Sequence, residues 1–384
     1  MASLFASGAA GTVLAAVLAL VLLGSLVFTL LSILAAQRYL SVPARMPVGV
    51  EPISILKPLA GLDEGLEANV RTFFEQEYAG DYEILFAVRR ADDPAAAVVR
   101  ELQKEYGGVP SRLLIVGEPP YPNAKVWSLD HMMREAAYDL LVMSDSDIRV
   151  TPTLLTTVAA EFEDPHIGVA TCPYRAVPGS GIWSKLEATG MNTDFIAGIL
   201  TARMLEGMKF AVGPTIVARK TVLEDIGGWD RVREYLAEDF VIGQFADQKG
   251  HGVMLSSYVI EHHIGTSTFA GNASHRIRWT RSTRRSRPAG YVGQLFTMPI
   301  PIALLLTAVR PEFWPALACA AIFRYSAAWV MSALVLRGSL AWHLVPLEDL
   351  MTFAFWIGGF FGNTIVWRGR VYRLLKDGRF ELKR

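Results

Sequence analysis

A long apolar run stands near the start of this 384-residue chain, before a region in which apolar and polar residues alternate. The run extends from Gly11 to Ala36 without a charge, which is long enough to cross a bilayer. A cleaved signal peptide is the alternative, but the run is longer than a typical signal core and has no basic segment before it. Arg38 and Arg45 follow, so the positive-inside rule places the next segment in the cytoplasm.

Residues 51 to about 260 alternate between short apolar strands and helices with apolar residues at helical spacing. We predict strands at Ile53–Leu56, Tyr82–Val88, Arg112–Val116, Leu140–Met143 and Val169–Cys172. We predict helices at Leu66–Gln76, Pro94–Tyr106, Ala124–Ala137 and Phe240–Gln248. Such alternation indicates an α/β domain with a mostly parallel sheet, whose ligands bind at the carboxyl ends of the strands.

Three further apolar stretches follow Tyr291, at Leu295–Val309, Phe313–Leu336 and Leu350–Trp367. The first contains two prolines and is short for a span, so we expect a re-entrant or surface-lying helix there. The chain ends in a basic tail that should stay in the cytoplasm, which requires an even number of crossings after the α/β domain. We therefore expect the second and third stretches to be spans. The basic residues of the tail are Arg368, Arg370, Arg373, Lys376, Arg379, Lys383 and Arg384.

These patterns divide the chain into an N-terminal anchor at residues 1–45, an α/β domain at 46–290, and membrane segments with the basic tail at 291–384. The two apolar ends account for a hydrophobic content of 52% and a charged content of only 19%. The 37 basic and 37 acidic residues balance, so overall charge gives no support for a nucleic-acid partner. Cys172 and Cys319 are too few for a disulfide framework, which is compatible with a reducing compartment.

Two acidic motifs follow predicted strands. Asp145-Ser146-Asp147 comes after a buried strand, where two carboxylates can share a divalent cation that neutralises a pyrophosphate leaving group; a solvated turn is the alternative. Asp92-Asp93 precedes Pro94, so one carboxylate can bind a nucleotide base or ribose while the other caps the helix.

Later in the chain, Glu238-Asp239 opens a predicted helix, where a carboxylate can act as general base or merely stabilise the helix N-terminus. A basic run follows, and one or two of its members can clamp a pyrophosphate while the rest contact anionic lipid headgroups. The run comprises Arg276, Arg278, Arg281, Arg284, Arg285 and Arg287. Adjacent His262 and His263 in a strand point to opposite faces, so we do not expect them to share a metal ion.

A series of short motifs extends from about residue 50 to 285. They are Leu56-Lys57-Pro58-Leu59 with Gly61, Asp92-Asp93-Pro94, Asn123-x-Lys125, Ser144-Asp145-Ser146, Ala237-Glu238-Asp239 and Arg278-Trp279. In order and spacing this set resembles the ceramide glucosyltransferase family. The tail motifs Trp367-Arg368-Gly369-Arg370 and Asp377-Gly378-Arg379-Phe380 add to the resemblance.

The resemblance implies a GT-A-type fold, an inverting single displacement, a UDP-sugar donor, a Mg²⁺ or Mn²⁺ cofactor and a membrane lipid acceptor. Asp239 would be the general base. The donor would be bound by Asp92, Asp93, Lys125, Asp145, Arg278 and Trp279, and the metal by Asp145 and Asp147. The expected location is the inner membrane of a bacterium, with the catalytic domain in the cytoplasm.

Three departures leave the acceptor open. His275 replaces the Arg or Gln that begins the family's Arg-Trp motif, Asp147 replaces a glycine of the eukaryotic enzymes, and Met191–Leu205 lacks the His-Pro of ceramide users. The acceptor can therefore be ceramide or, with an N-acetylglucosamine donor, a hopanoid polyol. Two other functions remain: a processive polysaccharide synthase, for which the apolar segments are few, and a non-catalytic lipid-binding or transport protein, against which the acidic motifs are intact.

Overall fold

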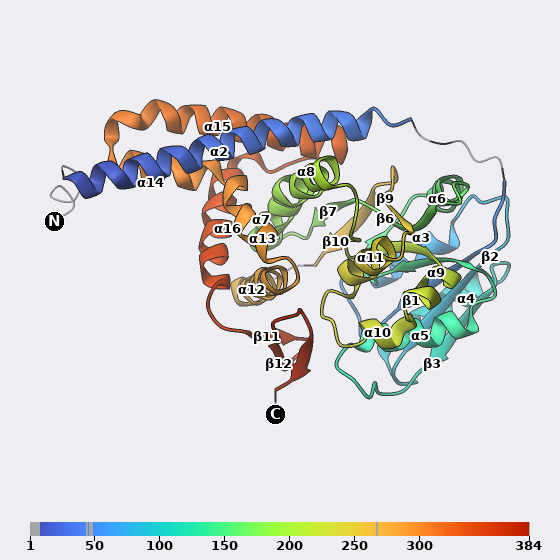
Figure 1. Ribbon diagram of the computed structural model, residues 1–384. Coiled ribbons are helices and arrows are strands. Elements are labelled where there is room, and N and C mark those ends of the chain that lie inside the picture. The colour runs from blue at the N-terminus through green and yellow to red at the C-terminus, as the bar shows by residue number, and fades with distance from the viewer. Residues whose placement is uncertain (1–7, 44, 46–48, 266–267, 384) are drawn as a thin grey trace. The chain divides into compact units, whose positions relative to one another are not determined.

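The computed structural model describes residues 8–43, 45, 49–265 and 268–383 (Figure 1). Its contacts divide the chain into two compact units. The helical unit contains Met1–Val42, Ser180–Leu205 and Ser267–Val366, and the α/β unit contains Pro43–Gly179, Glu206–Thr266 and Trp367–Arg384. The three predicted segments follow chain order, whereas the contacts group 180–205 and 267–290 with the apolar helices and the tail with the sheet. Arg384 of the predicted tail lies outside the described residues.

The α/β unit is built around a seven-stranded sheet of order β3-β2-β1-β4-β8-β6-β9. Its strands are β1 (Ile53–Pro58), β2 (Tyr82–Val88), β3 (Ser111–Ile115), β4 (Leu140–Ser144), β6 (Ile167–Thr171), β8 (Thr215–Arg219) and β9 (Gly252–Leu255). The β3-β2, β2-β1, β1-β4 and β6-β9 pairs are parallel, and β8 is antiparallel to both neighbours. The predicted α/β domain with a mostly parallel sheet is confirmed.

Helices connect the strands of this unit, and those at Leu66–Phe74, Pro94–Glu105, Ala124–Glu135 and Glu238–Gln248 match helices predicted from the apolar periodicity. They are α3 (Leu66–Phe74), α4 (Pro94–Glu105), α5 (Ala124–Glu135), α6 (Leu154–Phe162), α9 (Lys220–Asp225), α10 (Gly228–Val232) and α11 (Glu238–Gln248). The predicted strands and helices fall within a few residues of these bounds. Buried side chains of α5, such as Val126 and Met132, pack on Leu85 and Leu141 of the sheet. Burial of this apolar surface is the main favourable contribution to the fold.

Two smaller sheets complete the α/β unit. β5 (Ile148–Arg149), β10 (Ile260–Ile264) and β7 (Tyr174–Pro178) form a three-stranded sheet in that order. The tail supplies β12 (Arg370–Leu374) and β13 (Phe380–Leu382), which pair antiparallel and follow the short strand β11 (Thr364–Trp367). The pairing of β5 with β10 matters for function because it brings His262 opposite Ile148, the residue after Asp147.

The helical unit is formed by segments from three parts of the chain. Its helices are α2 (Ala9–Leu40), α7 (Ile182–Gly190), α8 (Ile196–Glu206), α12 (Phe269–Ser286), α13 (Pro288–Gly293), α14 (Pro299–Val309), α15 (Trp314–Trp329) and α16 (Val345–Gly359). Two π-helical turns, η1 (Met191–Phe195) and η4 (Val330–Val335), and three 3₁₀ turns, η2 (Gln294–Thr297), η3 (Pro311–Phe313) and η5 (Trp342–Leu344), connect or extend them. α2 lies beside α14 and α15 (Figure 1). Ala15, Ala303 and Ala320 are buried in the apolar cluster that these helices form.

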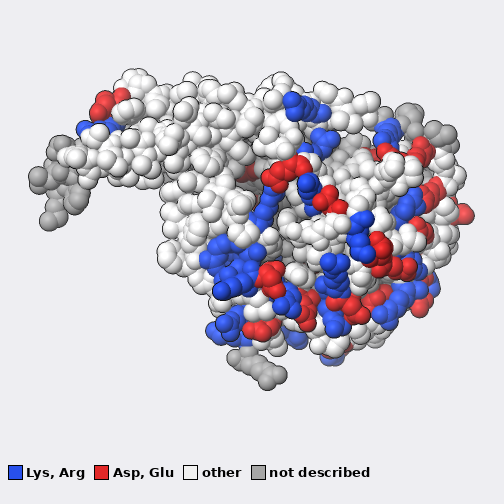
Figure 2. Space-filling model, viewed as in Figure 1, with Lys and Arg blue, Asp and Glu red and all other residues white. Residues whose placement is uncertain are grey.

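Two helices of this unit are long and apolar enough to cross a membrane, namely Ala9–Leu40 and Pro311–Val335. They agree with the predicted anchor and with the predicted span at Phe313–Leu336. Pro288–Thr297 and Pro299–Val309 form a pair bent by 64°, which fits a broken span or the re-entrant segment that the two prolines predicted. In Figure 2 the α2, α14 and α15 region is almost free of charged side chains, apart from a small group at one end.

The predicted third span is wrong. α16 ends at Gly359 after 15 residues, and Thr364–Trp367 is the strand β11 rather than the end of a helix. Hydropathy alone did not reveal this break, because apolar residues continue from α16 through Phe360 and Phe361 into β11. α16 instead contributes buried acidic side chains, Glu348 and Asp349, to contacts with other helices of the unit.

Candidate active site

The Asp145 loop, Asp145-Ser146-Asp147, follows β4 and is contacted by a buried lysine, Lys57. Because β1, β2 and β4 are parallel neighbours, the residues that follow them meet at one edge of the sheet. The Lys57 ammonium, at the end of β1, donates to the backbone carbonyl of Asp145 at 2.5 Å and lies 3.8 Å from the centre of the Phe73 ring. Burial lowers the pKa of Lys57 to about 7, although the nearby Asp145 and Asp147 oppose that shift.

Asp147, the second carboxylate of this loop, is paired with His262. Nε2 of His262 lies 3.1 Å from Oδ2 of Asp147. Burial by itself disfavours the ionised carboxylate, but His262 and Lys57 lower the pKa of Asp147 to about 2. His263 contacts Glu261 instead, at 2.9 Å, so the adjacent histidines contact different carboxylates. Asp147 is therefore ionised at neutral pH.

Lys125 connects Asp145 to the Glu238-Asp239 motif. Its ammonium lies 2.7 Å from Oδ1 of Asp145 and 3.1 Å from Oε1 of Glu238. Burial disfavours the charged ammonium, yet these carboxylates raise the pKa of Lys125 above its ordinary value. Asn123 supports the arrangement, because its Oδ1 caps α5 and its Nδ2 donates to Glu238 at 3.2 Å. The Asn-x-Lys motif thus combines a helix cap with an ion-pair bridge.

Asp239 occupies the first turn of α11 in a setting suited to a base. One carboxylate oxygen accepts a hydrogen bond from the backbone N–H of Gly213, a residue with φ of 25°. Burial and the neighbouring Glu238 raise the pKa of Asp239 to about 6, against the opposing effect of Lys125. A carboxylate with a pKa near neutrality can accept a proton and release it again during turnover.

A cavity of about 640 Å³ lies in the α/β unit and is lined by residues that follow β1, β2 and β3. Its wall includes both carboxylates of the predicted nucleotide motif, Asp92 and Asp93, together with Asp63 and Arg368. The Asp63 carboxylate accepts a hydrogen bond from the hydroxyl of Ser146 at 2.5 Å, which connects the cavity wall to the Asp145 loop. The cavity has the size of a small-molecule site.

The two carboxylates of the Asp92-Asp93 motif have different hydrogen-bond partners. Asp93 caps α4 by accepting from the N–H of Ala95 at 3.0 Å, and it also accepts from the N–H of Gly61 at 3.0 Å. Gly61 has φ of 72°, a backbone conformation that glycine adopts at no steric cost. Asp92 is exposed and pairs with Arg90 at 2.9 Å. The helix-capping role therefore belongs to Asp93, and donor binding by either residue stays a prediction.

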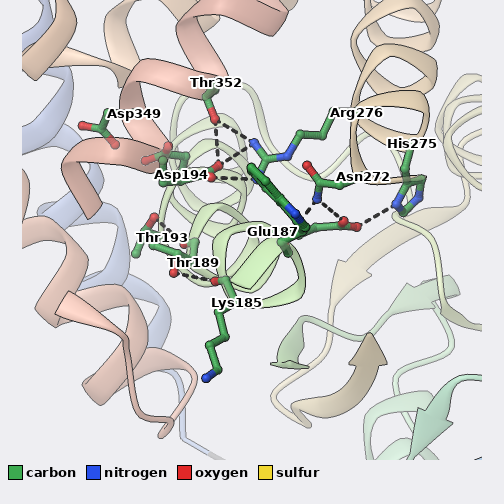
Figure 3. A network of polar contacts seen from close by, with 12 residues as sticks. Lys185, Glu187, Thr189, Thr193, Asp194, Asn272, His275, Arg276, Asp349 and Thr352 are labelled. Atoms are coloured by element: carbon green, nitrogen blue, oxygen red, sulfur yellow. Dashed lines mark hydrogen bonds and ion pairs between the residues drawn. The ribbon is translucent and has the colours of Figure 1, made fainter. Parts of the chain in front are cut away.

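Arg278 and Trp279 belong to the helical unit, on α12. The ring of Trp279 lies 4.3 Å from that of His275, measured between centroids. His275 Nδ1 is 2.6 Å from the Glu187 carboxylate on α7, and Figure 3 shows Asn272 donating to the same carboxylate. His275, the residue that departs from the family motif, therefore contacts Glu187 within this unit. A donor-binding role for Arg278 and Trp279 stays a prediction.

Several arginines of the predicted basic run have structural partners. Arg276 makes two hydrogen bonds of 2.7 Å to Glu348 of α16 and is buried (Figure 3). Arg284 donates to the carbonyl of Gly362 at 2.7 Å, and Arg281 donates to the carbonyl of Thr364. Cations are favoured near helix C-termini, and α16 ends just before these carbonyls. The density of the run is therefore explained in part by contacts to α16 and the segment after it.

Lys57 and His262 belong to the site, although no role for either was predicted from the sequence. A lysine within the apolar stretch Ile53–Pro58 is a signal of a special role, because lysine is rarely buried without a partner. The contact of His262 with Asp147 depends on the pairing of β5 with β10. No local sequence pattern predicts that pairing.

Among the described residues, no group of three or more His, Cys, Asp or Glu side chains has the arrangement of a complete metal site. The Oδ1 atom of Asp147 is buried and has no hydrogen-bond partner within the described part of the chain. Mg²⁺ is commonly bound by one or two carboxylates together with substrate phosphates. A pair of carboxylates with a buried free oxygen fits that kind of site.

Comparison with solved structures defines the class of fold. The structure of the mannosyltransferase PcManGT from Pyrobaculum calidifontis, in complex with GDP-Man and Mn²⁺, matches with a TM-score of 0.56 at 17% identity. The match covers 91% of this chain and 99% of that one. This protein therefore has the GT-A glycosyltransferase fold, as predicted.

Sequence comparison identifies the family within that class. The model of glycosyl transferase family 21 matches residues 17–380, so the chain belongs to this family. Ceramide glucosyltransferase 1 of Caenorhabditis elegans is 27% identical over 231 residues, which are 60% of this chain and 49% of the relative. Ceramide glucosyltransferase 3 of the same organism is 23% identical over 339 residues, which are 85% of this chain and 73% of that relative. The chain thus spans about half of the first relative's length.

Proposed function

We propose that this protein is a membrane-bound inverting glycosyltransferase that moves a hexose from a UDP-sugar to a hydroxyl group of a membrane lipid. The observation that carries the proposal is the placement of Asp239, a carboxylate with a raised pKa, beside the Lys125 bridge to Asp145 at the ligand-binding edge of a GT-A sheet. Family membership and the ceramide glucosyltransferase relatives support the lipid acceptor.

The donor would lie across the strand ends, with its nucleotide in the cavity that Asp92 and Asp93 line. Its diphosphate would face the Asp145 loop. A Mg²⁺ or Mn²⁺ ion would be held by Asp145 and Asp147 and would supply positive charge to the leaving diphosphate. The Mn²⁺ in the Pyrobaculum mannosyltransferase complex supports a divalent cation of this type. Lys57 and His262 would keep the two carboxylates in position.

In the transfer step, Asp239 would remove the proton from the lipid hydroxyl. The oxygen would attack the anomeric carbon from the face opposite UDP, and the bond between that carbon and the diphosphate oxygen would break. Negative charge then grows on the departing diphosphate, where stabilisation by fixed positive groups lowers the barrier. Lys125 is one such group in the α/β unit, and Arg278 is proposed as a second from the family resemblance. UDP leaves, and Asp239 releases its proton to solvent.

The apolar helices fit a membrane protein with a lipid acceptor. Many large apolar side chains of α2 are exposed, including Leu20 at 70% and Val13 at 63%. Exposure of this apolar surface to water is unfavourable, whereas contact with the hydrocarbon core of a bilayer is favourable. Ceramide and a hopanoid polyol are the acceptors proposed, with glucose or N-acetylglucosamine as the sugar. The cytoplasmic orientation of the α/β unit and a bacterial inner membrane remain part of the proposal. The comparisons do not favour a polysaccharide synthase or a transport protein.

Radiolabelled transfer with purified protein in detergent tests this function. UDP-glucose and UDP-N-acetylglucosamine are each combined with ceramide and with a hopanoid polyol, with Mn²⁺ and with EDTA. We expect label in one monoglycosylated lipid. The label should be absent when EDTA replaces Mn²⁺ and when the variant Asp239→Asn replaces the natural protein. Asp247→Asn, an exposed change on the same helix, is the control and should remain active. A polymeric product would favour the synthase, and an absence of labelled lipid would contradict the proposal.

A further inference from the structure

The C-terminal tail takes no part in the site proposed so far, yet it reaches the cavity. Arg368 lines the cavity wall together with Asp63, Asp92 and Asp93, and its Nη1 donates to the carbonyl of Ala60 at 3.5 Å. Ala60 follows the Leu56-Lys57-Pro58-Leu59 motif directly. A residue more than 300 positions away in sequence therefore lies at the end of β1, beside the segment that positions the Asp145 loop.

The tail is fixed to the α/β unit by backbone hydrogen bonds rather than by side chains alone. The N–H of Phe380 donates to the carbonyl of Glu234 at 2.9 Å, and Tyr235 forms a β-bridge with Arg379. Phe380 and Tyr372 are buried, with ring centroids 5.1 Å apart. These contacts hold the hairpin of β12 and β13 against the segment that leads into Glu238-Asp239. Arg368 is consequently presented from an anchored element.

The backbone of Arg368 has an unusual conformation for its residue type. Its φ is 46°, followed by 75° at Gly369, so both residues of the turn before β12 are left-handed. Asn or Gly is the usual residue at such a turn position, because a larger side chain pays a steric cost there. Among the described residues, Arg337 is the only other non-glycine residue with positive φ. A strained arginine at a cavity is a reason to look for a function of its side chain.

The charges around the cavity single out Arg368 among the three lining arginines. Arg90 pairs with Asp92 at 2.9 Å, and Arg89 pairs with Glu118 at 3.6 Å. Within the described part of the chain, the one hydrogen bond of Arg368 is to a backbone carbonyl, and no carboxylate lies within ion-pair distance of it. Most of the donor groups of its guanidinium are therefore available to an anionic ligand in the cavity.

We propose that Arg368 binds the diphosphate of the nucleotide donor, so that the C-terminal hairpin completes the donor site. This inference rests on the proposed function, because it assumes a UDP-sugar in the cavity. A guanidinium presents a planar set of N–H donors that matches phosphate oxygens, which an uncharged turn residue cannot replace. Arg368 is then a donor-binding residue, and its left-handed backbone is maintained by the anchored hairpin.

Calorimetry tests the proposal by measuring the Kd of the full-length protein in detergent for UDP and for uridine, with Mn²⁺ present. The variant Arg368→Gly suits the left-handed turn and keeps the hairpin, so its melting temperature should equal or exceed that of the natural protein. We expect its Kd for UDP to rise about tenfold, which is the usual scale for one charge-assisted phosphate contact, while its Kd for uridine stays unchanged. The matched control is Arg373→Gln, in β12 of the same hairpin, because Arg373 is exposed and does not line the cavity.

Three results would overturn the inference. Unchanged UDP affinity in Arg368→Gly would show that the guanidinium makes no contact with the donor. An equal loss of affinity for UDP and uridine would show that the change alters the cavity rather than a phosphate contact. The same loss in Arg373→Gln would show a general effect of positive charge in the hairpin. Absence of UDP binding by the unsubstituted protein would overturn the proposed function as well, whereas the first three results leave that function standing.

Discussion

Lys125 and Asp145 form an ion pair at the ligand-binding edge of the sheet, with 2.7 Å between the ammonium nitrogen and Oδ1. The same ammonium lies 3.1 Å from Glu238, so one positive charge holds together two carboxylates from different segments. Removal of that charge would leave the carboxylates facing each other in a largely buried site. Both the donor side and the base side of the proposed reaction therefore depend on Lys125.

Replacing Lys125 by Met should reduce transfer strongly and lower stability. Loss of one partner from a buried ion pair typically costs about 3–5 kcal/mol. Because this site is partly exposed, we expect a loss of about 3 kcal/mol, at the lower end of that range. Chemical denaturation in detergent measures the free energy of unfolding, and lipid glycosylation measures the activity. Lys125→Arg keeps the charge and should recover part of both. The control Lys104→Met removes an exposed pair with Glu101 and should change stability by less than about 1 kcal/mol. Equal effects of the two Met variants would contradict the bridging role.

The rate of transfer should rise with pH through about 6, because Asp239 accepts a proton only in its ionised form. One pH unit below its pKa, about a tenth of the enzyme has Asp239 ionised, so kcat should fall about tenfold there. Measurement of kcat between pH 4.5 and 8 would reveal this acidic limb.

Glu238→Gln tests the cause of that pH dependence. The negative charge of Glu238 helps to raise the pKa of Asp239, so its removal should move the acidic limb to lower pH. Asp247→Asn, on the same helix but exposed, should leave the limb in place. An unmoved limb in Glu238→Gln would indicate that another group titrates.

His262→Ala should weaken the response to Mn²⁺ at acidic pH. His262 lowers the pKa of Asp147, so the variant would protonate this carboxylate more readily and lose a metal ligand. We expect the Mn²⁺ concentration for half-maximal activity to rise by about 10-fold or more, the scale found for residues that support metal ligands. His263→Ala provides a neighbouring control, because His263 contacts Glu261. Similar metal titrations for both variants would argue against the support of Asp147 by His262.

The Arg276–Glu348 contact in the helical unit should behave as a buried ion pair. Arg276→Met leaves the Glu348 carboxylate unpaired at 1% exposure and should destabilise the protein by about 3–5 kcal/mol. The double variant Arg276→Met with Glu348→Leu removes both charges and should regain most of that loss. Thermal unfolding in detergent compares the three proteins. If the double variant is less stable than Arg276→Met, the two residues do not act as a pair.

Part of the site could be read from local sequence. Asp93 before Pro94 predicted a helix cap, and the structure has that cap, because an aspartate side chain satisfies the free N–H groups of the first turn wherever the helix begins. The strands after which the acidic motifs fall were likewise evident from short apolar runs, since central parallel strands are buried on both faces.

Hydrophobic periodicity was sufficient to predict an α/β domain with a mostly parallel sheet and the helix at Ala9–Leu40, because both follow from local patterns. The order and spacing of the short motifs carried the family resemblance, which implied the GT-A fold. Three contacts became evident only from the folded chain: His262 with Asp147, Lys125 with both Asp145 and Glu238, and Arg368 with the cavity. The end of α16 at Gly359, before the strand β11, is likewise a result of the structure. These contacts join residues far apart in the chain, and strand pairing and packing, which no local pattern encodes, bring them together.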